Sequence, residues 1–415
     1  MRVEIIGINS SGDGFGFFNG KKVFVKKSAV GDVIEFAILK ENKDFILGKI
    51  LKIIAKSPSR IDNLLCPNYD ECGGCNLLHL AEKNYYDYKE TIIKNTLERA
   101  GYNYDKGIKI VKIGENSRRR VAFQVKNNRL GFFERNTNHL KEIANCPLVA
   151  KEINAIIDDL KQLIKKVNIL EIAITAYSNG LEVLLTLKKD ITLTENEILK
   201  DFAENNKNVI LLSYRVGNDD YFLFYTKSTP ILQLADGISI ETSPNIFIQA
   251  TDEGQKAITN VVMEGLKGCK NILDLYCGIG TYTFPLASYG KVHSVEGLQS
   301  MIDILNKNIK TNGLVGKITS ECRNLVNSPL LKNELEKYDG IVINPPRNGA
   351  KAQCELIAKS RVKRVVMVSC NPQTFAVDVG ELRAGGYKLL DVVGVDQFYR
   401  TQHLEVVGVF EKDFD

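Results

Sequence analysis

The sequence has no long apolar run and little proline. No apolar stretch in its 415 residues approaches the roughly 18 consecutive residues that a bilayer-spanning helix requires, so we expect no membrane partner. Ten prolines beside 32 glycines exclude a collagen-like chain. Hydrophobic residues make up 44% and charged residues 25%, a balance that excludes a disordered chain.

The cysteines do not form the framework of a small disulfide-rich protein. Their number is nine, and an odd count cannot pair completely. The N-terminal Met1-Arg-Val-Glu-Ile-Ile alternates like a strand and lacks the basic-then-apolar layout of a signal peptide. We therefore expect a cytoplasmic protein, in which thiols stay reduced and their number needs another explanation.

Positive charge is concentrated near the N-terminus. The net charge is +5, and residues 1–60 hold 11 Lys and Arg against 6 Asp and Glu, so the remainder is neutral. About five short apolar runs, one of them opened by Asn19-Gly20, predict an oligonucleotide-binding type of β-barrel over residues 1–58. Cations neutralise phosphates and rings stack on bases, which favours RNA binding by Lys21, Lys22, Lys26 and Lys27 with Phe15, Phe17, Phe18 and Phe24. The alternative is a solvated basic face over an aromatic core.

Two further domains are expected after the barrel. Residues 59–235 mix cysteines, a helix and hairpins, which predicts an α+β domain. Residues 236–415 repeat strand, glycine turn and helix, which predicts an α/β domain with an open, mostly parallel sheet and a ligand at its carboxyl edge. The expected strands are 271–275, 291–296, 340–344, 364–369, 387–395 and 404–410.

A nucleoside-binding loop is predicted in the third domain. An apolar strand ends in Gly278-x-Gly280, and the next strand ends at Glu296, whose carboxylate is spaced to bind both ribose hydroxyls. Thr283 stands where a dinucleotide fingerprint has its third glycine, which favours a ligand without pyrophosphate such as S-adenosylmethionine (SAM). The alternative is a glycine turn in a domain that binds no nucleotide.

Three motifs near the C-terminus carry candidate catalytic groups. Cys370, in Ser-Cys-Asn-Pro, follows an expected strand at the edge where the glycine loop emerges. Asn344, in Asn-Pro-Pro-Arg, ends the preceding strand, and Glu405, in His-Leu-Glu, offers a carboxylate as base. Taken singly, a buried inert cysteine and a solvated glutamate would be the ordinary interpretations.

Four cysteines have the spacing of metal ligands. Cys66, Cys72 and Cys75 lie in one loop, and Cys146 followed by proline is a distant fourth. Three-plus-one spacing favours an iron–sulfur cluster, while structural zinc and unligated thiols remain the alternatives.

Together these motifs resemble the SAM-dependent RNA uracil-5 methyltransferase family, whose motifs occur in the same order. The stretch Asn245-Ile-Phe-Ile-Gln-Ala is similar to a further family motif. The resemblance implies a Rossmann-like methyltransferase domain, a TRAM-like RNA-binding barrel and a [4Fe–4S] cluster on the four cysteines. It also implies a SAM pocket, with the residues Gln249, Tyr276, Glu296 and Asn344.

By the same resemblance Cys370 is the nucleophile and Glu405 the proton acceptor. Thiolate addition at C6 makes C5 of uracil electron-rich enough to take a methyl group, after which Glu405 removes the C5 proton. The barrel and the cluster resemble members that modify 23S rRNA, with the tRNA uridine-54 reaction as the alternative. We expect RNA as the partner and no obligate protein partner.

Three departures from the family pattern keep open a non-catalytic RNA-binding protein with a decayed methyltransferase domain. Asn344 replaces an aspartate, Thr251 an asparagine, and Tyr399-Arg400 a Pro-His pair. Arg118–Arg120 is expected to be an exposed triplet that contacts RNA.

Overall fold

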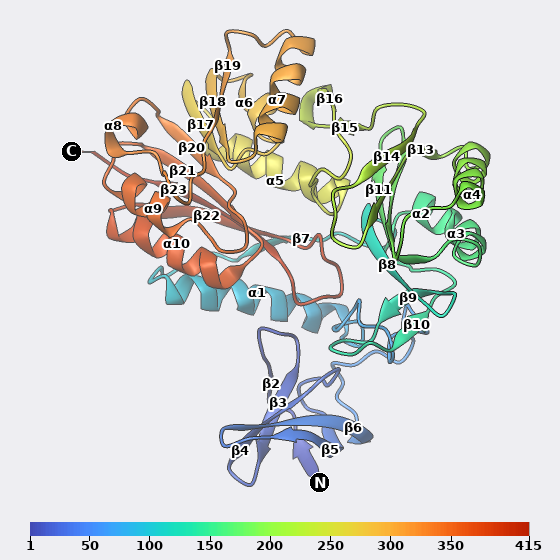
Figure 1. The fold of residues 1–415 in the computed structure, drawn as a ribbon. Helices are drawn as coiled ribbons and strands as arrows, with labels where there is room; N and C mark the ends of the chain where they lie inside the picture. The colour runs from blue at the N-terminus through green and yellow to red at the C-terminus, as the bar shows by residue number, and fades with distance from the viewer. Residues whose placement is uncertain (415) are drawn as a thin grey trace.

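The computed structural model describes residues 1–414. Their strands form four β-sheets (Figure 1). The first 55 residues form a six-stranded sheet with the order β1-β5-β6-β4-β3-β2. The sheet curls on itself, because β1 at one end contacts β3 near the other. The apolar core between them includes Val23, Ile34 and Phe36. The strands are β1 (Arg2–Glu4), β2 (Gly7–Ile8), β3 (Gly14–Phe18), β4 (Lys21–Val25), β5 (Val33–Glu41) and β6 (Phe45–Ala55).

A seven-stranded sheet with the order β10-β9-β8-β11-β12-β13-β14 forms the middle of the molecule. Alternate apolar side chains, among them Phe123, Ile172 and Leu185, face a core shared with the helices of this region. The strands are β8 (Arg120–Lys126), β9 (Arg129–Phe133), β10 (Leu140–Glu142), β11 (Ile169–Tyr177), β12 (Gly180–Leu187), β13 (Val209–Val216) and β14 (Phe222–Thr226). The helices are α2 (Lys151–Ala155), α3 (Ile157–Leu163) and α4 (Leu193–Asn205).

The C-terminal sheet has eight strands in the order β19-β18-β17-β20-β21-β23-β22-β7. All neighbours run parallel except β23, which lies antiparallel between β21 and β22. The six strands expected in this domain are present. The strands are β17 (Asn271–Leu275), β18 (Lys291–Glu296), β19 (Ile318–Cys322), β20 (Gly340–Ile343), β21 (Arg364–Ser369), β22 (Lys388–Val395) and β23 (Glu405–Glu411).

Helices cover both faces of this sheet and make a three-layer α/β unit (Figure 1). One layer contains α5 (Asp252–Gly265), α6 (Thr283–Leu286) and α7 (Gln299–Thr311), and the other contains α8 (Lys332–Leu335), α9 (Lys351–Ala358) and α10 (Pro372–Ala384). The Rossmann-like architecture expected for this region therefore agrees with the strand order.

Residues 82–111 lie against the C-terminal sheet, although the sequence assigns them to the region 59–235. α1 (Glu82–Arg99) packs on α10, and β7 (Lys109–Val111) pairs in parallel with β22. Two effects explain this packing. Ile93 and Leu97 are buried in the C-terminal core, and β7 covers the edge of β22 that would otherwise be open. The sequence predicted neither β7 nor β19.

A short connection leads from the central sheet to the C-terminal unit. It comprises β15 (Ile231–Gln233), a 3-10 turn (Ala235–Gly237) and β16 (Ser239–Glu241). Among residues 1–414, no helix is both long and apolar enough to cross a membrane.

Candidate active site

The glycine loop after β17 and the acid at the end of β18 form one unit. Tyr276, Gly278 and Gly280 have positive φ angles of 59°, 56° and 95°, so the backbone turns sharply after the strand. The half-buried Glu296 carboxylate accepts hydrogen bonds from the N–H groups of Gly278 at 3.1 Å and Gly297 at 2.7 Å. The structure thus brings the predicted loop residues and the predicted ribose-binding acid together.

A second acid lies beneath this loop. Asp274 is buried and accepts a hydrogen bond from Thr283 Oγ1 at 2.6 Å, and Thr283 contacts Ser294 Oγ at 2.9 Å. Burial raises the pKa of Asp274 to about 7, although the Thr283 hydrogen bond lowers it. Asp274 therefore joins the start of α6 to β17 and β18, a structural role that sequence reasoning missed.

Cys370 lies between the end of β21 and the start of α10. The thiol is half-buried, and the Arg347 guanidinium lies within its hydrogen-bonding reach. Burial raises the pKa of the Cys370 thiol, the Glu405 carboxylate raises it further, and Arg347 lowers it. Asn371 Nδ2 donates to the Arg347 carbonyl at 3.0 Å, so the two turns that carry the thiol and the guanidinium are tied together.

Glu405, the first residue of β23, is only 5% exposed. Burial raises the pKa of its carboxyl to about 7, while hydrogen bonding from Gln397 and the charge of Arg347 lower it. Gln397 Nε2 donates to Glu405 Oε1 at 2.9 Å and to Gln249 Oε1 at 2.8 Å. One side-chain amide therefore joins the predicted proton acceptor to a predicted cofactor-pocket residue.

Arg347 and Gln397 are site residues to which the sequence analysis gave no role. Arg347 influences both Cys370 and Glu405, so one guanidinium links the two predicted catalytic groups. Arg347 belongs to the Asn-Pro-Pro-Arg motif, so the sequence could have identified it as a site residue. Gln397 belongs to none of the quoted motifs, and only its contacts identify it.

The buried Gln249 is held by a second set of contacts. Its carbonyl accepts a hydrogen bond from Arg119 Nε at 2.9 Å, and Arg119 Nη2 donates to Gln255 Oε1 at 2.7 Å. Gln249 Nε2 approaches the Tyr282 hydroxyl at 3.4 Å. The segment before α5 is therefore held by contacts to the start of β8 in the central sheet and to the start of α6.

The expectation that Arg118–Arg120 is an exposed triplet is wrong, whereas its contact with RNA stays a prediction. Arg119 is 8% exposed and bonded as described above. Arg120 donates to the Ile248 carbonyl at 3.1 Å and lies 5.0 Å from the ring centroid of Phe247, which is itself 61% exposed. The start of β8 docks on the segment 245–251, whose carbonyl groups satisfy these guanidinium donors.

The departures from the family pattern are compatible with this geometry. The half-buried Asn344 donates its backbone N–H to the Leu275 carbonyl at 3.2 Å, at the end of β17. Thr251 caps α5 by accepting the Gly254 N–H at 2.9 Å, a cap that asparagine also provides.

The third departure lies in a loop between β22 and β23 that α1 holds. Asp396 forms a buried ion pair with Lys89 at 3.0 Å and accepts the Tyr85 hydroxyl at 2.7 Å. Lys89 also donates to the His403 carbonyl. Arg400, at a φ of 61°, donates its N–H to Tyr85 Oη at 2.8 Å, and its guanidinium lies 5.0 Å from the Tyr85 ring centroid. The loop that carries Gln397 is therefore anchored in the protein core.

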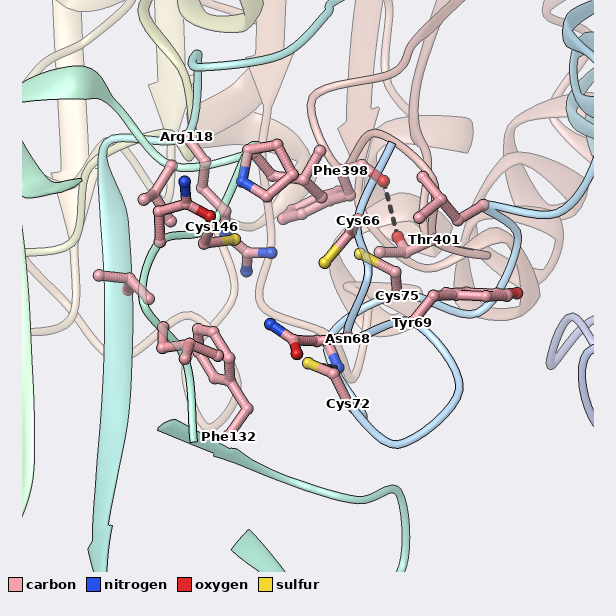
Figure 2. Close-up of a pocket in the computed structure, with 18 of the residues that line it drawn as sticks. Cys66, Asn68, Tyr69, Cys72, Cys75, Arg118, Phe132, Cys146, Phe398 and Thr401 are labelled. Atoms are coloured by element: carbon pink, nitrogen blue, oxygen red, sulfur yellow. Dashed lines mark hydrogen bonds between the residues drawn. The ribbon is translucent and has the colours of Figure 1, made fainter. Parts of the chain in front are cut away.

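The four predicted cluster cysteines line one cavity of about 390 Å³ (Figure 2). Figure 2 shows the sulfur atoms of Cys66, Cys72 and Cys75 on one side and Cys146 on the other. Burial raises the pKa of the Cys72 and Cys146 thiols, and neighbouring thiols raise both pKa values further. Within residues 1–414, no three His, Cys, Asp or Glu side chains converge as a site for a single metal ion.

The cysteine cavity also reaches the candidate active site. Its lining includes Arg347, Phe398 and His403. In addition, the N–H groups of Asn76 and Leu77, just after Cys75, lie 3.2 and 3.1 Å from the Arg400 carbonyl that accepts them. Because the four cysteines lie far from Cys370 in the sequence, they were expected to act only on the fold of the central domain. In the structure, however, the cysteine loop contacts the loop that carries Gln397.

The cysteine loop is closely seated on the end of β9. Gly73 donates to the Phe133 carbonyl at 3.1 Å, and a Cβ on Gly73 would lie 2.4 Å from that oxygen. Behind the loop, the Tyr69 hydroxyl contacts His79 Nδ1 at 2.6 Å and donates to the Asn76 carbonyl at 2.8 Å.

The basic and aromatic residues of the N-terminal sheet divide into two groups. Lys26 donates to the Arg135 carbonyl and Lys27 to the Asp70 carbonyl, so both attach this sheet to the cysteine region. Lys22 lies instead over the ring of Phe15, at 3.9 Å, and Phe17 is 58% exposed. Lys22, Phe15 and Phe17 therefore form a surface that combines rings and charge.

Comparison with known proteins gives consistent matches along the chain. A family profile described as tRNA (uracil-5-)-methyltransferase matches residues 115–413. An uncharacterized RNA methyltransferase of Caulobacter vibrioides is 33% identical, with 99% of each chain covered. The 23S rRNA (uracil(1939)-C(5))-methyltransferase of Legionella pneumophila (strain Corby) is 30% identical, with 99% of this chain and 96% of the relative covered.

A solved structure supports the fold over the whole length. The Pyrococcus abyssi tRNA (uracil-54, C5)-methyltransferase, in complex with S-adenosyl-L-homocysteine, superposes with a TM-score of 0.78 and 22% identity. The match covers 99% of both chains.

Proposed function

The chain belongs to the tRNA (uracil-5-)-methyltransferase family, and from this premise we propose that it methylates C5 of a uridine in RNA through a covalent adduct between Cys370 and C6. Its enzyme class is that of the SAM-dependent RNA (uracil-5-)-methyltransferases. The observation that carries the finer mechanism is the hydrogen bond of 2.9 Å from Gln397 Nε2 to the buried Glu405 carboxylate, because the same amide also binds Gln249.

Bound SAM supplies a methyl group activated by a sulfonium. In the proposed first step Cys370, as the thiolate, adds to C6 of uracil and pushes the electron pair onto the C4 oxygen as an enolate. C5 then forms its bond to the methyl carbon while the carbon–sulfur bond breaks. Glu405 takes the C5 proton, and the returning electron pair expels the Cys370 thiolate and leaves 5-methyluridine.

Arg347 and Gln397 are assigned positioning roles in this sequence. The Arg347 guanidinium lowers the pKa of the thiol and so favours its reactive form. Gln397 orients the Glu405 carboxylate through its 2.9 Å hydrogen bond and connects it to Gln249. Gln249, Tyr276, Glu296 and Asn344 are proposed to line the SAM pocket. The last three lie at the carboxyl ends of β17, β18 and β20, and Gln249 approaches Tyr282 at the start of α6.

An experiment with matched variants tests the catalytic assignment. Purified protein is incubated with methyl-labelled SAM and in vitro transcripts of 23S rRNA and tRNA, beside Cys370→Ala and Cys269→Ala. Cys269 is a buried thiol just before β17, at the end of that strand opposite the glycine loop. We expect label in RNA with wild type and Cys269→Ala and none with Cys370→Ala, whereas transfer by Cys370→Ala would remove Cys370 from its role.

A uridine bearing fluorine at C5 offers a second readout. No proton is available for Glu405 to remove, so the Cys370 adduct should persist after methyl transfer and survive denaturing electrophoresis. A protein–RNA band that forms with wild type but not with Cys370→Ala supports the adduct. Wild-type methylation of ordinary RNA without any trapped band would contradict it.

We propose that Cys66, Cys72, Cys75 and Cys146 hold a [4Fe–4S] cluster. Four sulfur donors around a cavity of about 390 Å³ suit such a group. The methyl transfer written above is redox-neutral, so the cluster is assigned the structural role of joining the two cysteine segments beside Arg347. Anaerobically purified protein should absorb broadly in the visible range and Cys75→Ser should not, whereas a colourless wild type with stoichiometric zinc would refute the cluster.

For the RNA, we propose 23S rRNA as the substrate and a TRAM-like, oligonucleotide-binding role for residues 1–58. The free surface of Phe17, Lys22 and Phe15 supports RNA contact by this sheet. The domain division 1–58, 59–235 and 236–415 is retained as a proposal, with residues 82–111 packed on the third unit. The alternatives are the tRNA uridine-54 reaction and a non-catalytic RNA-binding protein, which mapping of 5-methyluridine in a strain lacking this protein would separate.

A further inference from the structure

Five lysines surround a pocket at the far end of the central sheet, which we call the lysine pocket. They come from the β8–β9 hairpin, the segment after α3 and the end of β12, three places that are distant in sequence. The pocket has a volume of about 510 Å³. The lysines are Lys126, Lys165, Lys166, Lys188 and Lys189.

The positive charge of this pocket exceeds the negative charge in its lining, where five lysines face one acid, Glu195. All five lysines are exposed, and within residues 1–414 none of them forms a salt bridge. Lys126 and Lys165 donate only to neutral oxygens, the Asn138 carbonyl at 2.8 Å and Gln162 Oε1 at 3.2 Å. Like charges gathered in this way repel one another, so an anion that enters the pocket relieves an unfavourable interaction.

The acid that lines the pocket is already engaged. Glu195 accepts hydrogen bonds from the backbone and side chain of Thr192, both at 2.8 Å, as part of the capping box of α4. These hydrogen bonds and the charge of Lys189 lower the pKa of Glu195, so one negative charge stands against the five lysines. The amide groups of Asn127 and Asn128, in the tight β8–β9 turn, add uncharged donors to the lining.

The pocket is connected to the candidate active site by one strand. β8 starts at Arg120, which contacts the segment before α5, and ends at Lys126. Val121, near the start of β8, lines the cysteine cavity. Six steps along a strand span about 20 Å.

We propose that the lysine pocket binds the phosphate backbone of the RNA substrate at a second point, remote from the target uridine. The inference rests on the proposed RNA substrate, and it identifies a contact outside both the N-terminal sheet and the Arg118–Arg120 run. Several phosphates meeting several lysines explain why the charges converge in a concave site. The contact recognises the shape of a folded RNA rather than its sequence.

The test compares two variants with the same change in net charge. The pocket variant is K165Q/K166Q/K188Q/K189Q. The control, K310Q/K317Q/K337Q/K359Q, alters four exposed lysines of the C-terminal unit. RNA binding is measured by filter retention at several salt concentrations, with the transcripts of 23S rRNA and tRNA as probes, and melting curves verify that both variants fold.

We expect the pocket variant to bind RNA about tenfold more weakly, with a salt slope reduced by about 0.7 to 0.9 for each lost phosphate contact. Its KM for RNA should rise while kcat stays unchanged, because the reacting groups are untouched. Equal slopes and affinities for the pocket variant and the control would overturn the proposal. Loss of binding to anionic phosphatidylserine vesicles, with RNA binding intact, would overturn it in favour of a membrane contact.

The outcome is independent of the proposed reaction. If wild type transfers no methyl group to either transcript, the proposed function fails, but the difference in RNA binding between the two variants still decides the role of the pocket. If wild type methylates RNA and the variants bind alike, the function stands and the lysine pocket proposal is wrong.

Discussion

Glu405 combines near-complete burial with a pKa raised to about 7, which predicts a specific pH dependence. The carboxylate form accepts the C5 proton, so the rate of product release should rise with pH up to about 7 and then level off. Glu405→Gln should lower turnover by about 10² to 10⁴. Single-turnover assays from pH 5.5 to 8.5 measure this, and a flat wild-type profile would contradict the assignment.

The same raised pKa affects stability. The folded state keeps the Glu405 proton that the unfolded chain releases above its ordinary pKa of 4.5, so stability falls as pH rises from about 4.5 to 7. Glu405→Gln removes this loss and should raise the free energy of unfolding at pH 8 by up to about 3 kcal/mol. Denaturant titrations at pH 4.5 and 8 test this, since the gain should be confined to the higher pH.

Substitution of Gln397 tests whether this residue orients the Glu405 carboxylate or only stabilises the fold. Gln397→Leu removes the donor to Glu405, so the pKa of the carboxyl should rise further and the pH profile should move to higher pH. With ordinary uridine in the RNA, the covalent adduct of Cys370 should then accumulate during turnover, because proton removal becomes slower than methyl transfer. Gln402→Leu is the matched control, since the Gln402 side chain hydrogen-bonds to the exposed His403 ring and not to Glu405.

At this scale the sequence predicted which residues carry functional groups but not all of their partners. Glu296 ends β18, Cys370 follows β21 and Glu405 begins the last strand, all in recognisable motifs, so their position beside strand ends was predictable. Gln397 was not, because its role arises from two hydrogen bonds to residues 148 and 8 positions away in sequence.

At the scale of elements, α1 acts as the support of the loop between β22 and β23. Lys89→Met would leave Asp396 as a buried charge without its partner, and we expect a loss of about 3 to 5 kcal/mol in the free energy of unfolding. The double variant Lys89→Met/Asp396→Asn should recover much of that loss. Lys83→Gln, on the exposed side of the same helix, should leave stability unchanged; a similar loss there would contradict the argument.

The elements that the sequence predicted correctly have local signals. The strands of the C-terminal sheet are apolar runs bounded by glycine turns, and the glycine loop has its own spacing. β7 and the burial of Arg119 were missed because both depend on docking between distant segments. Charge alone does not distinguish a guanidinium that binds RNA from one that binds oxygen atoms within the protein.

At the scale of the whole molecule, the excess charge of residues 1–60 serves two purposes. Lys26 and Lys27 attach the N-terminal sheet, so only part of the basic group is available to RNA. We expect Lys22→Gln with Phe17→Ala to weaken RNA binding by about 1 to 3 kcal/mol for one lost base stack and to reduce the salt slope by about 0.7 to 0.9. Lys26→Gln is the matched control in the same filter assay, and an equal effect there would contradict the division.

The contact between α1 and the loop that follows β22 also bears on how the chain is made. Tyr85 and Arg400 are 315 residues apart, and translation proceeds at about 5 to 20 residues per second. On the ribosome, about 16 to 60 s therefore pass between the synthesis of Tyr85 and that of Arg400. During that interval α1 lacks the loop after β22, and its apolar side chains are available to a chaperone.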